Sequence, residues 1–124
     1  MPRMSVRDPI AWQHARDELS SMLEHAARTR STVTYSDVAV RAFGGTVPAR
    51  SRLVMDLLME VDEEWERATG LIIASLVVRA DSGMPGDGYF TFLARRFGRD
   101  IQDPAAAWRI EAERVWDAYA AGAP

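Results

Sequence analysis

The fold of this chain depends on residues 31–54, which read STVTYSDVAVRAFGGTVPARSRLV. The stretch opens with β-branched residues, which favour a short strand within residues 31–35. Thr34 and Asp37 then have the spacing of a capping box, with Asp in place of the usual Glu. They predict the start of a short helix that runs to Phe43. A short strand is therefore expected to lead directly into a capped helix.

The residues after this helix predict a second helix and a second strand. Gly44-Gly45 ends the first helix, because glycine readily takes the left-handed conformation. Pro48 suits a first helical turn, and apolar residues recur at helical spacing over about residues 49–68. Gly70 ends this helix. Residues 71–79 are nearly all apolar and predict a buried strand.

The flanking segments add three more helices. Asp8-Pro9 supplies an N-cap and a first helical position, and the amphipathic pattern that follows fades near Arg28. Residues 80–88 are rich in glycine and proline and predict a loop. Helical spacing resumes over residues 89–97 and again over about residues 104–120.

This order of elements resembles the winged helix-turn-helix. Residues 32–34 are expected to pair with part of residues 74–78. The strand that would return after the wing is weak or missing, because Tyr89 begins a helical pattern. We therefore predict a mainly α fold with a small β-hairpin or two-stranded sheet. Its winged-helix-like core covers about residues 31–89, and two extra C-terminal helices cover about residues 89–120.

Length and composition suit a soluble protein. The chain has 124 residues, 48% of them hydrophobic, which favours one domain over residues 1–124 with a real core. The absence of cysteine excludes disulfides and thiolate chemistry and fits a reducing cytoplasm. No apolar run reaches the roughly 20 residues of a membrane span, and residues 1–7 precede no signal-peptide core. We expect a cytoplasmic protein without a membrane partner.

The charged residues are distributed unevenly. All 15 basic residues are arginine, which excludes mechanisms that need a Schiff-base or P-loop lysine. Residues 1–53 carry eight arginines and five acids, whereas residues 54–124 carry seven arginines and thirteen acids, so that the net charge is −3. A basic face on the first half is therefore possible, with the acidic half pointing away.

Two short segments resemble one known family. Thr34-Tyr35-Ser36-Asp37-Val38-Ala39 is similar to the segment that opens the helix-turn-helix of the O6-alkylguanine DNA alkyltransferases and the alkyltransferase-like proteins. Pro48-Ala49-Arg50-Ser51-Arg52-Leu53-Val54 resembles the start of their recognition helix. The resemblance implies the winged-helix scaffold, with Tyr35, Arg50 and Arg52 most similar to nucleic-acid-facing positions. The family's Pro-Cys-His-Arg motif has no counterpart here, so alkyl transfer is not implied.

A set of mostly basic residues could contact nucleic acid. Ala49-Arg50-Ser51-Arg52 provides the small and basic first turn of a helix that enters a major groove. Side chains nearby could reach phosphates, although Asp81 and Asp87 in the wing oppose this because such wings are usually basic. The candidate nucleic-acid-binding residues are Tyr35, Arg41, Arg50, Ser51, Arg52 and Arg79.

No pattern points to a cofactor, a metal or a catalytic residue. Residues 83–88 lack the lysine and the spacing of a P-loop and are expected to form a turn. His14 and His25 lie roughly 16 Å apart along one helix and cannot share a metal ion. Trp65 falls on an apolar stripe and is expected in the core; alternatively, Met55 and Met59 with Trp65 could line an exposed groove or a dimer face.

These observations favour a small non-enzymatic winged-helix protein, of bacterial type, that binds duplex DNA, as a regulator and as a dimer. The acidic net charge supports an alternative, a protein–protein interaction module or accessory subunit of a bacterial defence, toxin–antitoxin or regulatory system.

Overall fold

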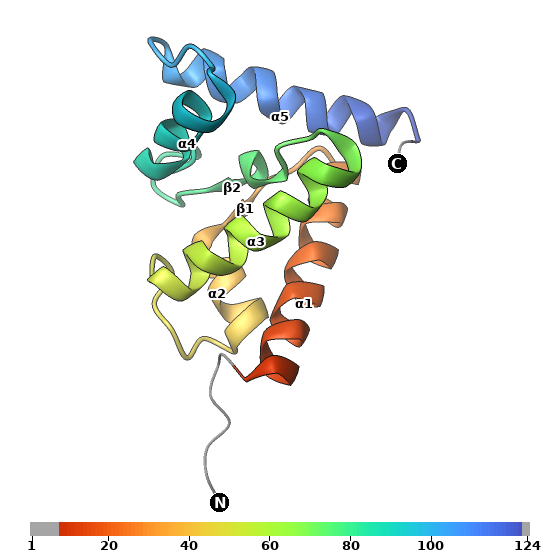
Figure 1. The fold of residues 1–124 in the computed structure, drawn as a ribbon, viewed down its shortest axis with the longest axis vertical. Coiled ribbons are helices and arrows are strands. Elements are labelled where there is room, and N and C mark those ends of the chain that lie inside the picture. Colours follow the sequence, from red (N-terminus) through yellow and green to blue (C-terminus); the bar gives the residue numbers. More distant parts are fainter. Residues whose placement is uncertain (1–7, 123–124) are drawn as a thin grey trace, which may run out of the picture.

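The computed structural model describes residues 8–122, so the expectation for residues 1–7 lies outside the described part of the chain. The fold is mainly helical, with a small sheet of two parallel strands (Figure 1). In chain order, the elements are α1 (Pro9–Arg28), β1 (Val33–Thr34), α2 (Tyr35–Phe43), α3 (Arg52–Thr69), the 3₁₀ helix η1 (Ile73–Leu76), β2 (Val77–Val78), α4 (Asp87–Phe97) and α5 (Pro104–Ala120).

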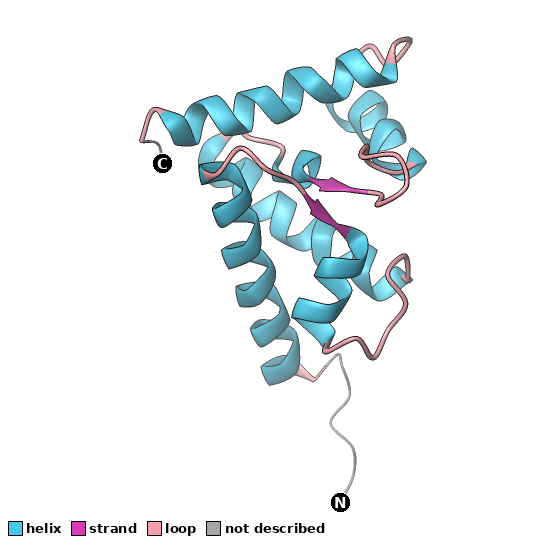
Figure 2. Cartoon of the chain, turned by 180° about the vertical axis from the view of Figure 1, so that it is seen from behind, coloured by secondary structure: helices cyan, strands magenta, loops and turns pink. Residues whose placement is uncertain are grey.

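The two strands pair in parallel, with Val33 opposite Val77 and Thr34 opposite Val78. This confirms the predicted pairing of the two segments. Because the strands run in the same direction, they form a two-stranded sheet and not a hairpin. The sheet lies between α5 on one side and α2 on the other (Figure 2).

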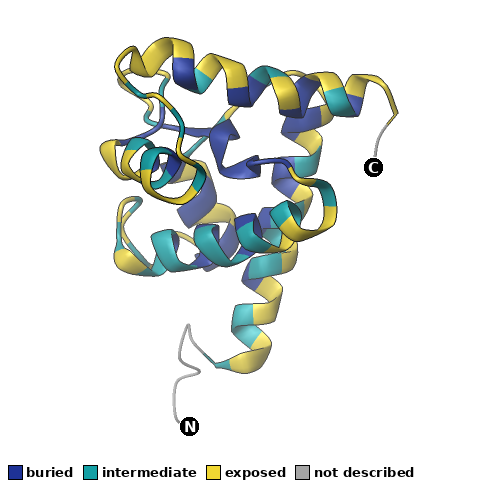
Figure 3. Ribbon diagram, turned by 45° about the horizontal axis from the view of Figure 1, so that its top comes forward, coloured by how far each residue is buried: buried dark blue, intermediate teal, exposed yellow. Residues whose placement is uncertain are grey.

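The predicted strand over residues 71–79 is wrong in length. Residues 71–78 are all buried (Figure 3). Within them, however, only the two residues of β2 form a strand, and η1 is helical. A longer strand would lack hydrogen-bond partners, because β1 offers only two residues for pairing. Buried backbone groups must be paired, so the remaining residues take another conformation. The amide N–H of Ala74 instead donates to Oδ1 of Asp62 at 2.9 Å.

Helix α3 begins later than the predicted position near residue 49. Ser51 is its N-cap, and the Ser51 hydroxyl oxygen accepts a hydrogen bond from the amide of Val54 at 3.3 Å. The amide of Ser51 in turn donates to the carbonyl of Pro48 at 3.1 Å, which closes a turn before the helix. Pro48 therefore belongs to the connection, and Arg50 precedes the helix, whereas Arg52 is its first residue.

The expected wing is a compact turn. The amide of Arg79 donates to the carbonyl of Met84 at 2.8 Å, and the amide of Gly83, which has φ of 69°, donates to the carbonyl of Arg79 at 2.9 Å. Pro85 and Gly86 are buried, and α4 begins at once. Within residues 79–122 no strand returns along β2, as the helical spacing from Tyr89 onward predicts.

Hydrogen bonds from two tryptophans of α5 attach this helix to the rest of the fold. The indole of Trp116 donates to the carbonyl of Ser31 at 3.0 Å, and the indole of Trp108 donates to the carbonyl of Ser75 at 2.8 Å. Arg30 adds ion pairs to Glu113 and Asp117 on the same helix. Among residues 8–122, no helix has the length and apolar character needed to cross a membrane.

Candidate nucleic-acid interface

Local hydrogen bonds fix the ends of α2. The hydroxyl oxygen of Thr34 accepts from the amide of Asp37 at 3.0 Å, and Oδ2 of Asp37 accepts from the amide of Thr34 at 3.1 Å. This reciprocal pair confirms the predicted capping box. At the other end, Gly44 and Gly45 have φ of 65° and 77°, the left-handed region that favours glycine. The chain therefore turns sharply toward α3.

The start of α3 carries two uncompensated positive charges. Arg50 and Arg52 are exposed, and neither forms an ion pair with any carboxylate of residues 8–122. The first turn of α3 contains no acidic residue. Since the positive end of the helix dipole also lies here, this end of the molecule favours an anion.

Two other predicted contacts, Arg41 and Arg79, are already paired. Nε of Arg41 lies 2.7 Å from Oε2 of Glu18. The guanidinium of Arg79 donates to both oxygens of Asp81, at 3.0 and 2.7 Å. This bidentate pair raises the pKa of Arg79 and lowers the pKa of Asp81. Both pairs are exposed, so a phosphate could displace the carboxylates at little cost.

The remaining candidates, Tyr35 and Ser51, are engaged in hydrogen bonds that hold the fold. Tyr35 is 7% exposed, and its hydroxyl oxygen accepts from the amide of Gly86 at 3.1 Å. The Ser51 hydroxyl caps α3. In this structure Tyr35 ties α2 to the start of α4, and Ser51 caps the helix that begins at Arg52.

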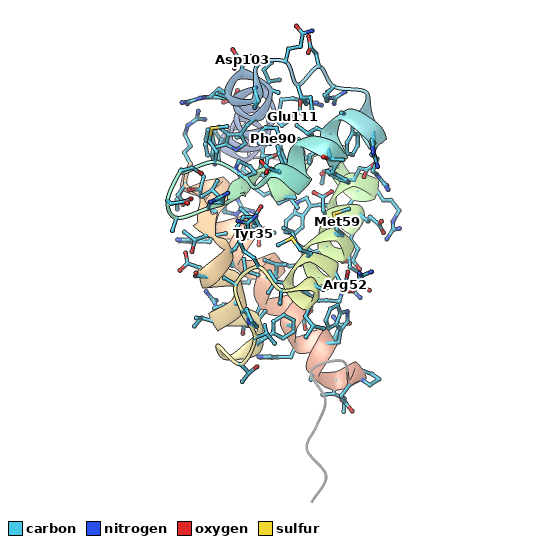
Figure 4. All side chains as sticks on the ribbon, turned by 90° about the vertical axis from the view of Figure 1, so that its left-hand side faces the viewer. Tyr35, Arg52, Met59, Phe90, Asp103 and Glu111 are labelled. Carbon is cyan, nitrogen blue, oxygen red and sulfur yellow. The ribbon has the colours of Figure 1, made fainter. Side chains whose placement is uncertain are left out.

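The structure brings three of the predicted residues together. Tyr35, Arg50 and Arg79 line one hollow of about 240 Å³. Arg41 lines a different hollow, beside His25. Arg52 lies at the start of α3, on the face of the molecule that also shows Tyr35 (Figure 4).

Acidic residues follow this basic end along α3. Asp56 lies one turn beyond Arg52, and Glu60, Glu63 and Glu64 continue the series. Glu60 and Glu64 pair with Arg16 of α1, and Glu63 pairs with Arg96 of α4. Within α3, whose residues are all described, the first turn is therefore the part that favours an anion.

A pocket of about 390 Å³ adjoins the basic end and was not part of the predicted site. Helix α3 contributes Met55, Leu58 and Met59, and α4 contributes Tyr89 and Phe92. The expectation of a methionine-lined groove holds for the two methionines. Trp65 does not line this pocket; it packs against the core, as its apolar stripe predicts, and donates to the hydroxyl of Tyr119 at 2.9 Å. Only the helical spacing of the methionines gave a sequence signal, because the other wall comes from α4.

One buried carboxylate is hydrogen-bonded to the backbone of Ala74, a residue that lines the pocket. Asp62 is fully buried, and only its Oδ1 has a hydrogen-bond partner within the described chain. Burial raises the pKa of Asp62 to about 6, although the bond from the Ala74 amide opposes the shift. Among residues 8–122, no cluster of three or more histidine or carboxylate side chains could hold a metal ion.

Comparison of the chain with protein-family models, with curated proteins and with solved structures found no match.

Proposed function

We propose that this protein is a winged-helix-like module that binds duplex DNA through the start of α3. The observation that carries the proposal is the pair of exposed arginines, Arg50 and Arg52, at the positive end of a helix whose first turn has no acid. Phosphate groups are the anions that such a helix end binds most readily. The role is one of binding, not catalysis.

The arrangement of the elements supports the same proposal. Helix α2, the glycine turn and α3 follow one another as in a helix-turn-helix, and β1 and β2 flank them. In that motif the first residues of the second helix contact base edges, while neighbouring side chains contact phosphates. At that position Arg50 and Arg52 would contact base edges and the phosphates beside them. Arg41 and Arg79 would exchange Glu18 and Asp81 for phosphates.

Fluorescence anisotropy with a short labelled duplex tests the proposal. At about 50 mM salt, where phosphate contacts are strong, the unmodified protein should bind, and Arg50→Ala with Arg52→Ala should weaken binding at least tenfold. The matched control is Arg67→Ala with Arg95→Ala. These arginines are also exposed and form no ion pair within residues 8–122, but they lie away from the start of α3.

Both double variants lose two positive charges. The control therefore distinguishes a specific binding site at the start of α3 from a general effect of net charge. An equal loss of affinity in both, or no binding by the unmodified protein at low salt, would overturn the proposal.

A second candidate, contact between protein chains, is favoured by the acidic second half of the molecule. Residues 54–124 contain thirteen acids against seven arginines. Ile110, on α5 in this half, is 59% exposed. Sedimentation velocity over a range of concentrations tests the simplest form, a homodimer, which should dissociate when Ile110→Glu places a charge at an apolar contact.

A further inference from the structure

We propose that the pocket between α3 and α4 binds a small aromatic carboxylate, whose carboxylate pairs with Arg50 at the rim. The proposal concerns a ligand site and does not depend on DNA binding. It rests on the size of the pocket, on its apolar walls, and on two polar groups that meet at Gly86.

The walls suit a flat apolar ligand. The pocket is lined by Met55 and Met59 of α3 and by Tyr89 and Phe92 of α4, together with Ala74 of η1. The volume of about 390 Å³ lies within the range of small-molecule sites. Methionine side chains adapt their shape and make favourable contacts with aromatic rings. The interior of the pocket therefore matches one or two fused rings.

The polar groups at the rim suit an anion. The guanidinium of Arg50 lines the pocket and has no carboxylate partner within residues 8–122. The Tyr35 hydroxyl lines it too. The hydroxyl oxygen of Tyr35 accepts from the Gly86 amide. The O–H of Tyr35 has no hydrogen-bond acceptor within the described chain. A carboxylate could accept from both groups, and no acidic side chain is among the described residues that line the pocket.

Gly86 makes this convergence possible. A Cβ atom at residue 86 would lie 3.2 Å from Nη2 of Arg50 and 3.7 Å from the hydroxyl oxygen of Tyr35. A side chain there would crowd the guanidinium, which would have to shift by a few tenths of an ångström. The glycine therefore serves close approach of the two donors, and its own φ of −74° requires no special residue.

NMR of methyl-labelled methionine, with naphthoate as the probe, locates binding directly. The methyl signals of Met55 and Met59 should shift and saturate together, while that of Met22, a buried core residue of α1 that does not line the pocket, should not. The neutral isostere naphthamide should bind about tenfold more weakly.

Two arginine variants test the anchor. Arg50→Ala should weaken naphthoate about tenfold and leave naphthamide unchanged, whereas Arg52→Ala should change neither, because Arg52 does not line the pocket. Both residues are exposed, so both variants should keep the fold, which the remaining methyl signals report. Three results would overturn the proposal: no saturable shift at Met55 and Met59, equal affinity for acid and amide, or equal losses in the two variants.

Discussion

Tyr35 and Gly86 are 51 residues apart in the chain, yet the amide of Gly86 donates a hydrogen bond to the hydroxyl oxygen of Tyr35 at 3.1 Å. The bond is buried and joins the start of α2 to the start of α4. Arg50 lies beside the same glycine, and Tyr35, Arg50 and Gly86 all line the pocket between α3 and α4. The contact therefore lies where the basic end of the molecule meets the pocket.

Tyr35→Phe should lower the free energy of unfolding by about 1–3 kcal/mol, because the Gly86 amide is left buried without a partner. Urea denaturation measures the change. Tyr119→Phe is the matched control. It also removes a buried hydroxyl, but the Trp65 indole that donates to it is only partly buried and can reach water, so a smaller loss is expected. Equal losses of unfolding free energy in the two variants would show that the bond to Gly86 contributes no more to stability than the bond to Trp65.

Asp62 should make stability fall as pH rises. Its pKa is about 6 in the folded protein, against an ordinary value of 3.8, so between these values the folded state holds a proton that the unfolded chain has released. The stabilisation is complete below the lower value and is lost as pH passes the upper one. At about 1.4 kcal/mol per pKa unit, the loss is about 3 kcal/mol.

The groups that face Asp62 come from three elements. Glu63 and Glu66 lie on α3 itself, Arg96 reaches it from α4, and the Ala74 amide belongs to η1. Asp62→Asn keeps an acceptor for that amide but cannot ionise, so its unfolding free energy should change less between about pH 5 and about pH 7.5. Parallel curves for variant and unmodified protein would show that Asp62 keeps an ordinary pKa.

Local signals predicted the ends of the helices well. The capping box of Thr34 and Asp37 and the glycine stop at Gly44 involve residues within one turn of each other, so the sequence contains the whole interaction. The length of the second strand was missed because it depends on how many residues β1 offers as partners. The burial of Tyr35 was missed because its partner, Gly86, lies far along the chain.

The candidate site was predictable in part for the same reason. The exposure of Arg50 and Arg52 follows from their place before and at the start of an amphipathic helix. The pairing of Arg41 with Glu18 joins α2 to α1, and no pattern within either helix indicates it. The pocket needs α3 and α4 side by side, which sequence spacing alone does not give.

Asp81→Asn should strengthen DNA binding. The carboxylate of Asp81 holds both donor nitrogens of the Arg79 guanidinium. Loss of its charge frees Arg79 for a phosphate and removes a repulsion, so affinity in the anisotropy titration should rise a few-fold, with a steeper dependence on salt. Asp100→Asn removes one exposed negative charge away from this site and should leave affinity nearly unchanged. An equal gain in both variants would point to net charge alone.

Ser51 offers a test that separates its two possible roles. As the N-cap of α3 it accepts a hydrogen bond from the Val54 amide, so Ser51→Ala should lower the free energy of unfolding by about 1 kcal/mol. Ser51→Asp keeps an acceptor at the cap and complements the helix dipole, so its stability should stay close to that of the unmodified protein.

The same Asp places a negative charge beside Arg50 and Arg52, where phosphate is proposed to bind. Ser51→Asp should therefore bind DNA at least tenfold more weakly while remaining as stable as the unmodified protein in urea. Ser51→Ala should show the reverse order, with lower stability and nearly full binding. If Ser51→Asp retained full affinity, the start of α3 would not be the DNA-binding end, because an anion so close to both arginines must compete with phosphate.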